Sequence, residues 1–220
     1  MEKYLQEEVI IIKKSENISF YTHFIGFLLF LIGTIYLIYK TKTLRLNIVS
    51  IIYGASTMLL FLASSLYHAN KKEDDEISLW RKLDHIAIFI MIAGTYTPIT
   101  YVYLSGYWKW SIIIIQWSLV VGGLFFKFFY LNAPRYLYTI IYLLMGWMGI
   151  VPIKEFISTM SDMSLIFMFG GGLAYTIGAV FYIIKKPQFK INFGFHEIFH
   201  IFILIGAILH YLLVYYALVL

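Results

Sequence analysis

The chain has 220 residues, of which 61% are hydrophobic and only 13% are charged, and its mean hydropathy is +0.80. This composition excludes an ordinary soluble domain and indicates a protein that uses lipid as its solvent. The net charge of +5 comes from Lys and Arg residues that lie between apolar runs, and Cys is absent, so a nucleic-acid partner, disulfides and thiolate metal sites are not expected.

Seven apolar segments follow one another along the chain, each near the roughly 20 residues that a helix needs to cross the hydrocarbon core. They cover about residues 18–39, 46–68, 83–104, 108–130, 135–154, 163–184 and 196–218. We therefore predict an all-α membrane protein, a seven-helix transmembrane bundle formed by residues 18–220 and preceded by a charged tail, residues 1–17. The first segment has no small-residue cleavage pattern after it, so we expect it to be retained. Pro152 is expected to kink the fifth segment.

The positive charges predict the orientation of this bundle, because cytoplasmic loops carry the excess of Lys and Arg. With the N-terminus inside, twelve of the 17 Lys and Arg residues fall on the cytoplasmic side and five on the other. The twelve are Lys3, Lys13, Lys14, Lys71, Lys72, Arg81, Lys82, Lys127, Arg135, Lys185, Lys186 and Lys190, and the five are Lys40, Lys42, Arg45, Lys109 and Lys154. We therefore expect a cytoplasmic N-terminus, an extracellular C-terminus and a location in the cell membrane.

Ionisable residues of the spans gather at one predicted bilayer depth, although a charge at the bilayer centre costs about 2.5–3.5 kcal/mol on insertion scales. His68 closes the second segment, Asp84 and His85 open the third, and His196, Glu197 and His200 open the seventh. In the predicted orientation the second segment ends inside, and the third and seventh begin there. Because the charge count used no histidine, this shared depth independently supports one site beneath the inner headgroups.

The spacing of these residues predicts a metal site. His196 and His200 are four residues apart, so both lie on one face of a helix and can bind one ion. With His68 as the third imidazole, a fourth position stays open, as in catalytic zinc sites. Asp84 could hydrogen-bond a metal-bound water, and Ser64, one turn before His68, could orient a ligand, the water or a substrate carbonyl. We therefore predict Zn²⁺, which an all-imidazole site favours over magnesium or calcium; packing roles for these side chains are the alternative.

Other residues near this site allow different interpretations. The string from His196 to His200 spells the HExxH pattern of zinc proteases, in which the Glu activates water. No further ligand motif of that protease class follows, and Glu197 could equally pack or support a ligand. His23 lies on the inner side but is a weaker ligand candidate. His210 lies ten residues beyond His200, about 15 Å along a helix, which is too far to share the site.

The same residues resemble the hemolysin III branch of the progestin and adipoQ receptors, which includes the adiponectin receptors. The resemblance covers nearly the whole chain and rests on Ser64-Ser65-Leu66-Tyr67-His68, on Leu83-Asp84-His85 followed by Ala93-Gly94-Thr95-Tyr96-Thr97-Pro98, on Gly194-Phe195-His196-Glu197-Ile198-Phe199-His200, and on Thr22-His23 with Gly26. It implies a zinc ion on the three histidines, a water held by Asp84 with Ser64 nearby, and an inward N-terminus. The wider superfamily resembles lipid-amide hydrolases, including alkaline ceramidases, whereas the bacterial branch was named for haemolysis. The sequence has no counterpart of the animal receptors' long cytosolic N-terminal domain, so a hormone partner is not expected.

Two functions compete on these grounds. The first is a zinc-dependent hydrolase of a membrane lipid amide or ester, in which Asp84 accepts a proton from water and returns it to the leaving group. The alternative is a non-enzymatic membrane-homeostasis, sensor or cytolytic protein in which a structural zinc joins the second and seventh helices. An intramembrane protease that uses the HExxH string is a third, weaker hypothesis. Membrane lipids are the expected partners, and the sequence defines neither the substrate nor the oligomeric state.

Overall fold

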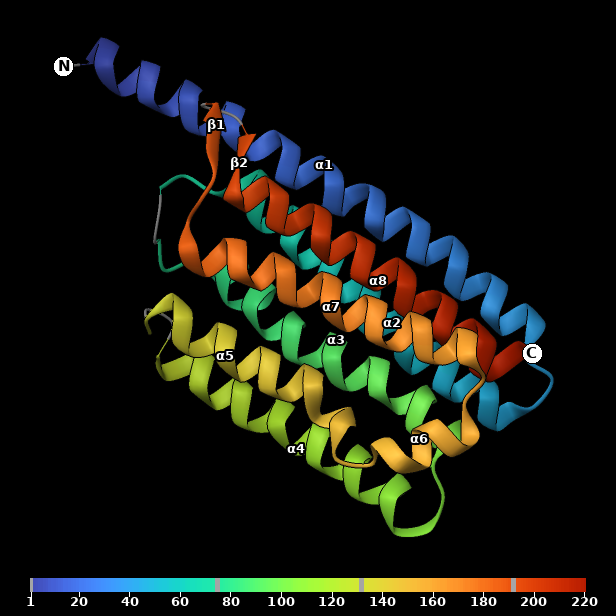
Figure 1. The fold of residues 1–220 in the computed structure, drawn as a ribbon. Coiled ribbons are helices and arrows are strands. Elements are labelled where there is room, and N and C mark those ends of the chain that lie inside the picture. The colour runs from blue at the N-terminus through green and yellow to red at the C-terminus, as the bar shows by residue number, and fades with distance from the viewer. Residues whose placement is uncertain (1, 74–75, 131–132, 191–192) are drawn as a thin grey trace.

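The computed structural model describes residues 2–73, 76–130, 133–190 and 193–220, and helices dominate it (Figure 1). The long helices are α1 (Glu2–Lys40), α2 (Leu44–Asn70), α3 (Leu79–Tyr103), α4 (Gly106–Phe129), α7 (Asp162–Ile184) and α8 (Phe195–Val219). Between α4 and α7 the chain forms α5 (Arg135–Gly146), the short 3₁₀ helix η1 (Trp147–Ile150) and α6 (Ile153–Thr159). A small antiparallel hairpin, β1 (Gln188–Lys190) and β2 (Phe193–Gly194), connects α7 to α8.

Six helices in the described part of the chain are long and apolar enough to cross a membrane: α1 from Glu16 onward, α2, α3, α4, α7 and α8. A seventh candidate consists of α5 and η1 followed by α6, and it is bent by 54° at the break between them. Pro152 lies in this break, and its missing N–H and its ring both disfavour a continuous helix. The prediction of an all-α membrane bundle is therefore confirmed, and the segment expected at 135–154 is bent, with its second helix ending at Thr159.

Side-chain caps set the beginning of two helices that carry the predicted site. The Ser78 hydroxyl accepts a hydrogen bond from the Arg81 amide at 3.2 Å and starts α3, four residues before the apolar segment. At the start of α8, the Glu197 carboxylate accepts a hydrogen bond from the Gly194 amide at 2.7 Å. Both contacts satisfy amides at or beside the helix start that lack a partner within the helix.

The helices close into a ring, and α3 and α8 also touch inside it. Around the ring, α1 packs on α2, α2 on α3, α3 on α5, α5 on α7, α7 on α8, and α8 on α1, while α4 packs on the outer side of α3. Glycines permit the closest approaches: a Cβ atom added to Gly54 would collide with Thr34 of α1, and one added to Gly94 would collide with Ser56 of α2. This packing brings the end of α2 and the start of α8 to the same level of the bundle (Figure 1).

Candidate metal centre

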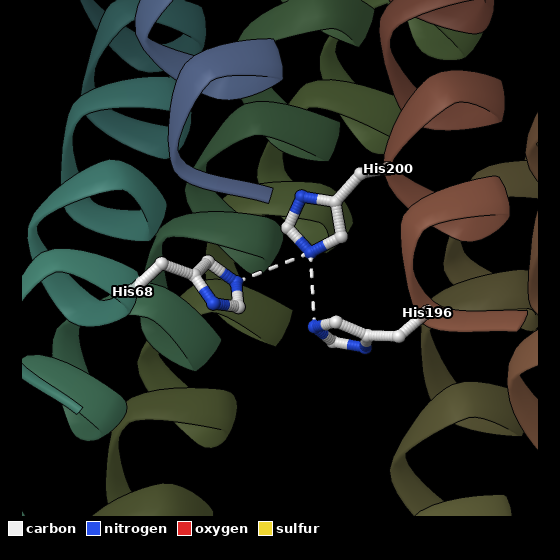
Figure 2. Close-up of side chains that lie close together, drawn as sticks. All are labelled: His68, His196 and His200. Carbon is white, nitrogen blue, oxygen red and sulfur yellow. Dashed lines mark hydrogen bonds between the residues drawn. The ribbon is translucent and has the colours of Figure 1, made fainter. Parts of the chain in front are cut away.

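Three histidines from two helices point their rings at a common centre (Figure 2). His68 lies in the last turn of α2, and His196 and His200 lie in the first two turns of α8. The Nε2 atom of His200 is 3.2 Å from the Nε2 atom of His68 and 3.2 Å from that of His196. One nitrogen from each ring can be chosen so that all three lie within 4.8 Å of one another. The structure therefore brings together the three residues that the sequence predicted as ligands.

The spacing and the chemistry of these nitrogens fit a zinc ion. Two nitrogens that bind one tetrahedral zinc at about 2.0–2.1 Å lie about 3.3–3.4 Å apart, close to the two distances observed. A neutral imidazole carries a proton on only one nitrogen, so the other nitrogen of each ring has a lone pair that a metal ion can accept. His68 and His200 are buried, at 4% and 2% exposure, and all three histidines line one cavity. One metal ion can accept a lone pair from each of the three nitrogens.

Asp84 and Ser64 lie beside the histidines but outside the ligand group. Ser64 is buried one helical turn before His68, and its hydroxyl faces the Asp84 carboxylate of α3. Both residues line the same cavity as the three histidines. Within the described chain, the set of side chains close enough to share an ion contains His68, His196 and His200 and does not include Asp84. The Asp84 carboxylate therefore lines the cavity without belonging to the ligand group.

His23 and His210, which the sequence analysis ranked below the three predicted ligands, both lie outside the ligand group. The ring of His23 lies against that of His200, with 3.9 Å between centroids and 44° between the ring planes, but His23 is not part of the ligand group. Neither of its nitrogens has a hydrogen-bond partner in the described part of the chain. His210 lies farther along α8, where its Nε2 atom is 3.3 Å from the Met168 carbonyl oxygen.

A cavity of about 520 Å³ extends from the histidines into the bundle, which is within the range of small-molecule sites. Its far end is formed by side chains and backbone of α3, α5, η1, α7 and α8, including Tyr96, Trp147, Gly172, Tyr175 and His210. These residues are mostly aromatic or small. The metal end is polar and the far end mainly apolar, so the cavity suits a molecule with a polar head and an apolar tail.

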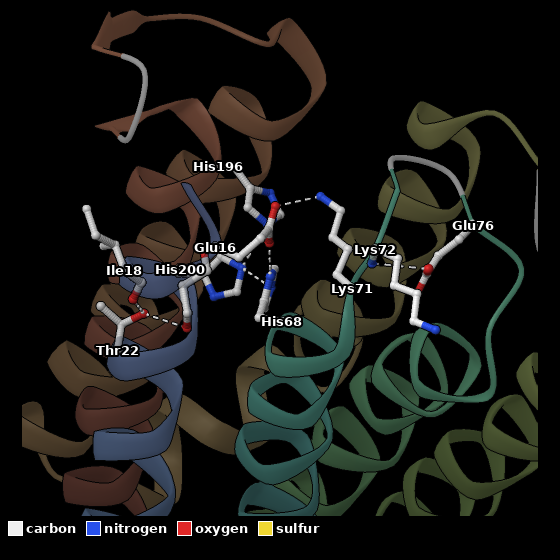
Figure 3. Close-up of polar contacts among 10 residues, drawn as sticks. Glu16, Ile18, Thr22, His68, Lys71, Lys72, Glu76, His196 and His200 are labelled. Carbon is white, nitrogen blue, oxygen red and sulfur yellow. Dashed lines mark hydrogen bonds and ion pairs between the residues drawn. The ribbon is translucent and has the colours of Figure 1, made fainter. Parts of the chain in front are cut away.

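Two acidic residues have contacts that the sequence did not reveal. Glu16 of α1 is 2.5 Å from Nδ1 of His68 through one carboxylate oxygen, and its other oxygen accepts a hydrogen bond from Lys71 at 2.7 Å (Figure 3). The sequence assigned Glu16 to the charged tail, because hydropathy gives no signal for a contact across 52 positions. Glu197 is buried and caps the start of α8, so it stabilises the first turn of the helix that carries His196 and His200.

Comparison with known proteins places the chain in a family. The family model described as "Haemolysin-III related" matches residues 12–211. The chain is 37% identical over 199 residues to "Hemolysin-3 homolog" of Bacillus subtilis (strain 168), covering 88% of this chain and 90% of that protein. It is 34% identical over 209 residues to "Hemolysin-3" of Bacillus cereus, covering 93% of each. A more distant match, 25% identical over 218 residues, is the "Adiponectin receptor protein" of Drosophila melanogaster, with 90% of this chain and 49% of that protein covered. The chain belongs to the haemolysin III family, a family of integral membrane proteins related to the adiponectin receptors.

Proposed function

We propose that this protein is a zinc-dependent hydrolase that cleaves an amide or ester bond of a membrane lipid. The observation that carries the proposal is the convergence of three imidazole nitrogens at the polar end of a cavity whose other end is apolar. His68, His196 and His200 would hold the ion. When bound, zinc supplies a Lewis acid that activates water and polarises a carbonyl group.

Asp84 is the residue that would move the proton. Its carboxylate lines the cavity beside the histidines without belonging to the ligand group, so it can accept the proton of the attacking water. As the C–O bond forms and the C–N or C–O bond of the substrate breaks, the same carboxylate returns that proton to the leaving nitrogen or oxygen. Ser64 faces Asp84 and would orient the carboxylate or the substrate carbonyl.

The apolar part of the cavity would hold the tail of the lipid. Its lining runs from His200 toward His210 along α8, ten residues that rise about 15 Å in a helix. The tail would move from the hydrocarbon of the bilayer into an apolar lining, so van der Waals packing rather than transfer out of water would hold it there. Tail binding would thus place the head-group linkage near the histidines and Asp84.

Hydrolysis by the purified protein tests this proposal. The zinc-loaded protein in detergent micelles would be incubated with a ceramide and, in parallel, with ester lipids, and the released fatty acid would be measured by mass spectrometry. We expect release that a chelator and His196→Ala both abolish and that Ile208→Ala, an exposed position on the same helix outside the cavity lining, leaves in place. Absence of turnover by the zinc-loaded protein on both lipid classes, or equal turnover by His196→Ala, would contradict the proposal.

A structural metal is the second candidate function, because the ligand group joins α2 to α8. Such a clamp could stabilise a protein that senses or perturbs membranes, and the names of the two Bacillus relatives refer to haemolysis. This candidate predicts that Asp84→Asn alters neither zinc binding nor the stability that zinc confers. The hydrolase predicts that Asp84→Asn abolishes turnover while zinc still binds.

A further inference from the structure

The carboxylate of Glu16 on α1 contacts His68 of the metal centre and the neighbouring Lys71 (Figure 3). One oxygen lies 2.5 Å from Nδ1 of His68, and the other lies 2.7 Å from the Lys71 ammonium. Glu16 is buried, with 9% of its surface exposed, although it lies at the edge of the apolar part of α1. A carboxylate is costly to bury unless it is paired and hydrogen-bonded, so these two contacts explain how it is tolerated there.

The contact with Glu16 determines which nitrogen of His68 faces the centre. A carboxylate accepts hydrogen bonds and cannot donate one when ionised, so the proton of a neutral His68 ring resides on Nδ1. Nε2 of the same ring then carries the lone pair, and this is the atom 3.2 Å from Nε2 of His200. Carboxylates that accept from the outer nitrogen of a metal-binding histidine fix its tautomer and ring orientation and raise its basicity.

Lys71 holds the carboxylate in this position. It lies one turn after His68 near the end of α2, and its ammonium donates to the Glu16 oxygen that His68 does not use. The same two-point contact prevents Glu16 from rotating toward the Nε2 side of the centre, where it would compete as a ligand. By contrast, Nδ1 of His200 has no hydrogen-bond partner among the described residues. Among these residues, the His68 ring is therefore oriented by a carboxylate, and the His200 ring is not.

We propose that Glu16 is a positioning residue of the metal centre, which fixes the His68 ring and its tautomer and is itself held by Lys71. This inference rests on the proposed function, because it takes the three histidines as zinc ligands. It also assigns α1, which contributes none of the three histidines, a direct part in the affinity for the metal. Loss of such a partner typically weakens metal binding by about 10–100-fold.

Zinc affinity measured by competition with a chromophoric chelator tests this role. The variants are Glu16→Ala, which removes the acceptor, and Glu16→Gln, which keeps an acceptor oxygen and nearly the same shape, with the exposed neighbour Asn17→Ala as control. We expect the Kd for zinc to rise about 10–100-fold in Glu16→Ala, to rise less in Glu16→Gln, and to be unchanged in Asn17→Ala. Thermal unfolding of the metal-free variants provides a second readout.

A merely structural contact between α1 and α2 gives a different pattern. It would lower the unfolding temperature of the metal-free Glu16→Ala variant and leave its zinc affinity equal to that of the wild type, which would overturn the inference. If Glu16→Ala does not fold, the nearly isosteric Glu16→Gln decides: an unchanged Kd and an unchanged spectrum of the cobalt-substituted protein would overturn it. The proposed function fails separately, if the wild type binds no zinc or if His196→Ala binds it as tightly.

Discussion

Zinc should raise the unfolding temperature of this protein, because the ligand group exists only in the folded bundle. His68 and His200 are 132 positions apart in the sequence, so the unfolded chain does not hold both near one ion. A ligand that binds only the native state stabilises it by about 2.7 kcal/mol when its free concentration is 100 times Kd. For a chain of this size, each kcal/mol shifts Tm by about 2–4 °C. We therefore expect a rise of about 5–11 °C.

Thermal unfolding of the detergent-solubilised protein measures this rise, with free zinc set by a metal buffer. The His196→Ala/His200→Ala variant should show no rise at the same free zinc concentration, because only one imidazole of the group is left. His210→Gln is the matched control: it removes a half-buried imidazole from the same helix, so its starting Tm falls but the rise with zinc persists. An equal rise in the double variant, or none in the wild type, would refute the assignment of the centre.

Three further predictions concern the chemistry, the cavity and the packing. Asp84→Asn should bind zinc as the wild type does yet hydrolyse lipid at least about 100-fold more slowly; parallel metal and turnover assays check this, and loss of zinc with the activity would contradict it. Gly172→Leu should shift the substrate preference toward lipids with shorter tails, because Gly172 lines the cavity and the new leucine side chain would fill part of it. Gly122→Leu, at a position with open space around it, should leave the preference unchanged, and equal chain-length profiles of the two variants would contradict the prediction. Gly94→Leu should destabilise the bundle by about 1–3 kcal/mol through overpacking against Ser56, and an unchanged unfolding midpoint would contradict it.

Hydropathy predicted the helices well where composition alone decides them. The apolar segment at 163–184 matches α7 (Asp162–Ile184) within one residue. The boundaries differ where polar residues belong to a helix: α3 begins four residues before its apolar segment because Ser78 caps it, and α1 begins at Glu2 although its apolar run starts near residue 18. The bend after η1 needed tertiary information, since a proline predicts a kink but not its angle.

Part of the candidate site was predictable because the position of a residue along a predicted span gives its depth in the membrane. Segment ends fixed the level of His68, and helical spacing fixed the shared face of His196 and His200. Glu16 was missed because its partner is 52 positions away and because charged residues outside an apolar run look like surface residues. The cavity could not be predicted, since its shape depends on the packing of six helices.

X-ray absorption at the zinc edge would test the central claim most directly, with the wild type and the His196→Ala/His200→Ala variant purified side by side. We expect about one zinc per chain in the wild type, with three nitrogen ligands and an oxygen at about 2.0–2.1 Å, and no bound zinc in the variant. Equal zinc content in the two proteins, or a wild-type ion without three imidazole ligands, would contradict the claim.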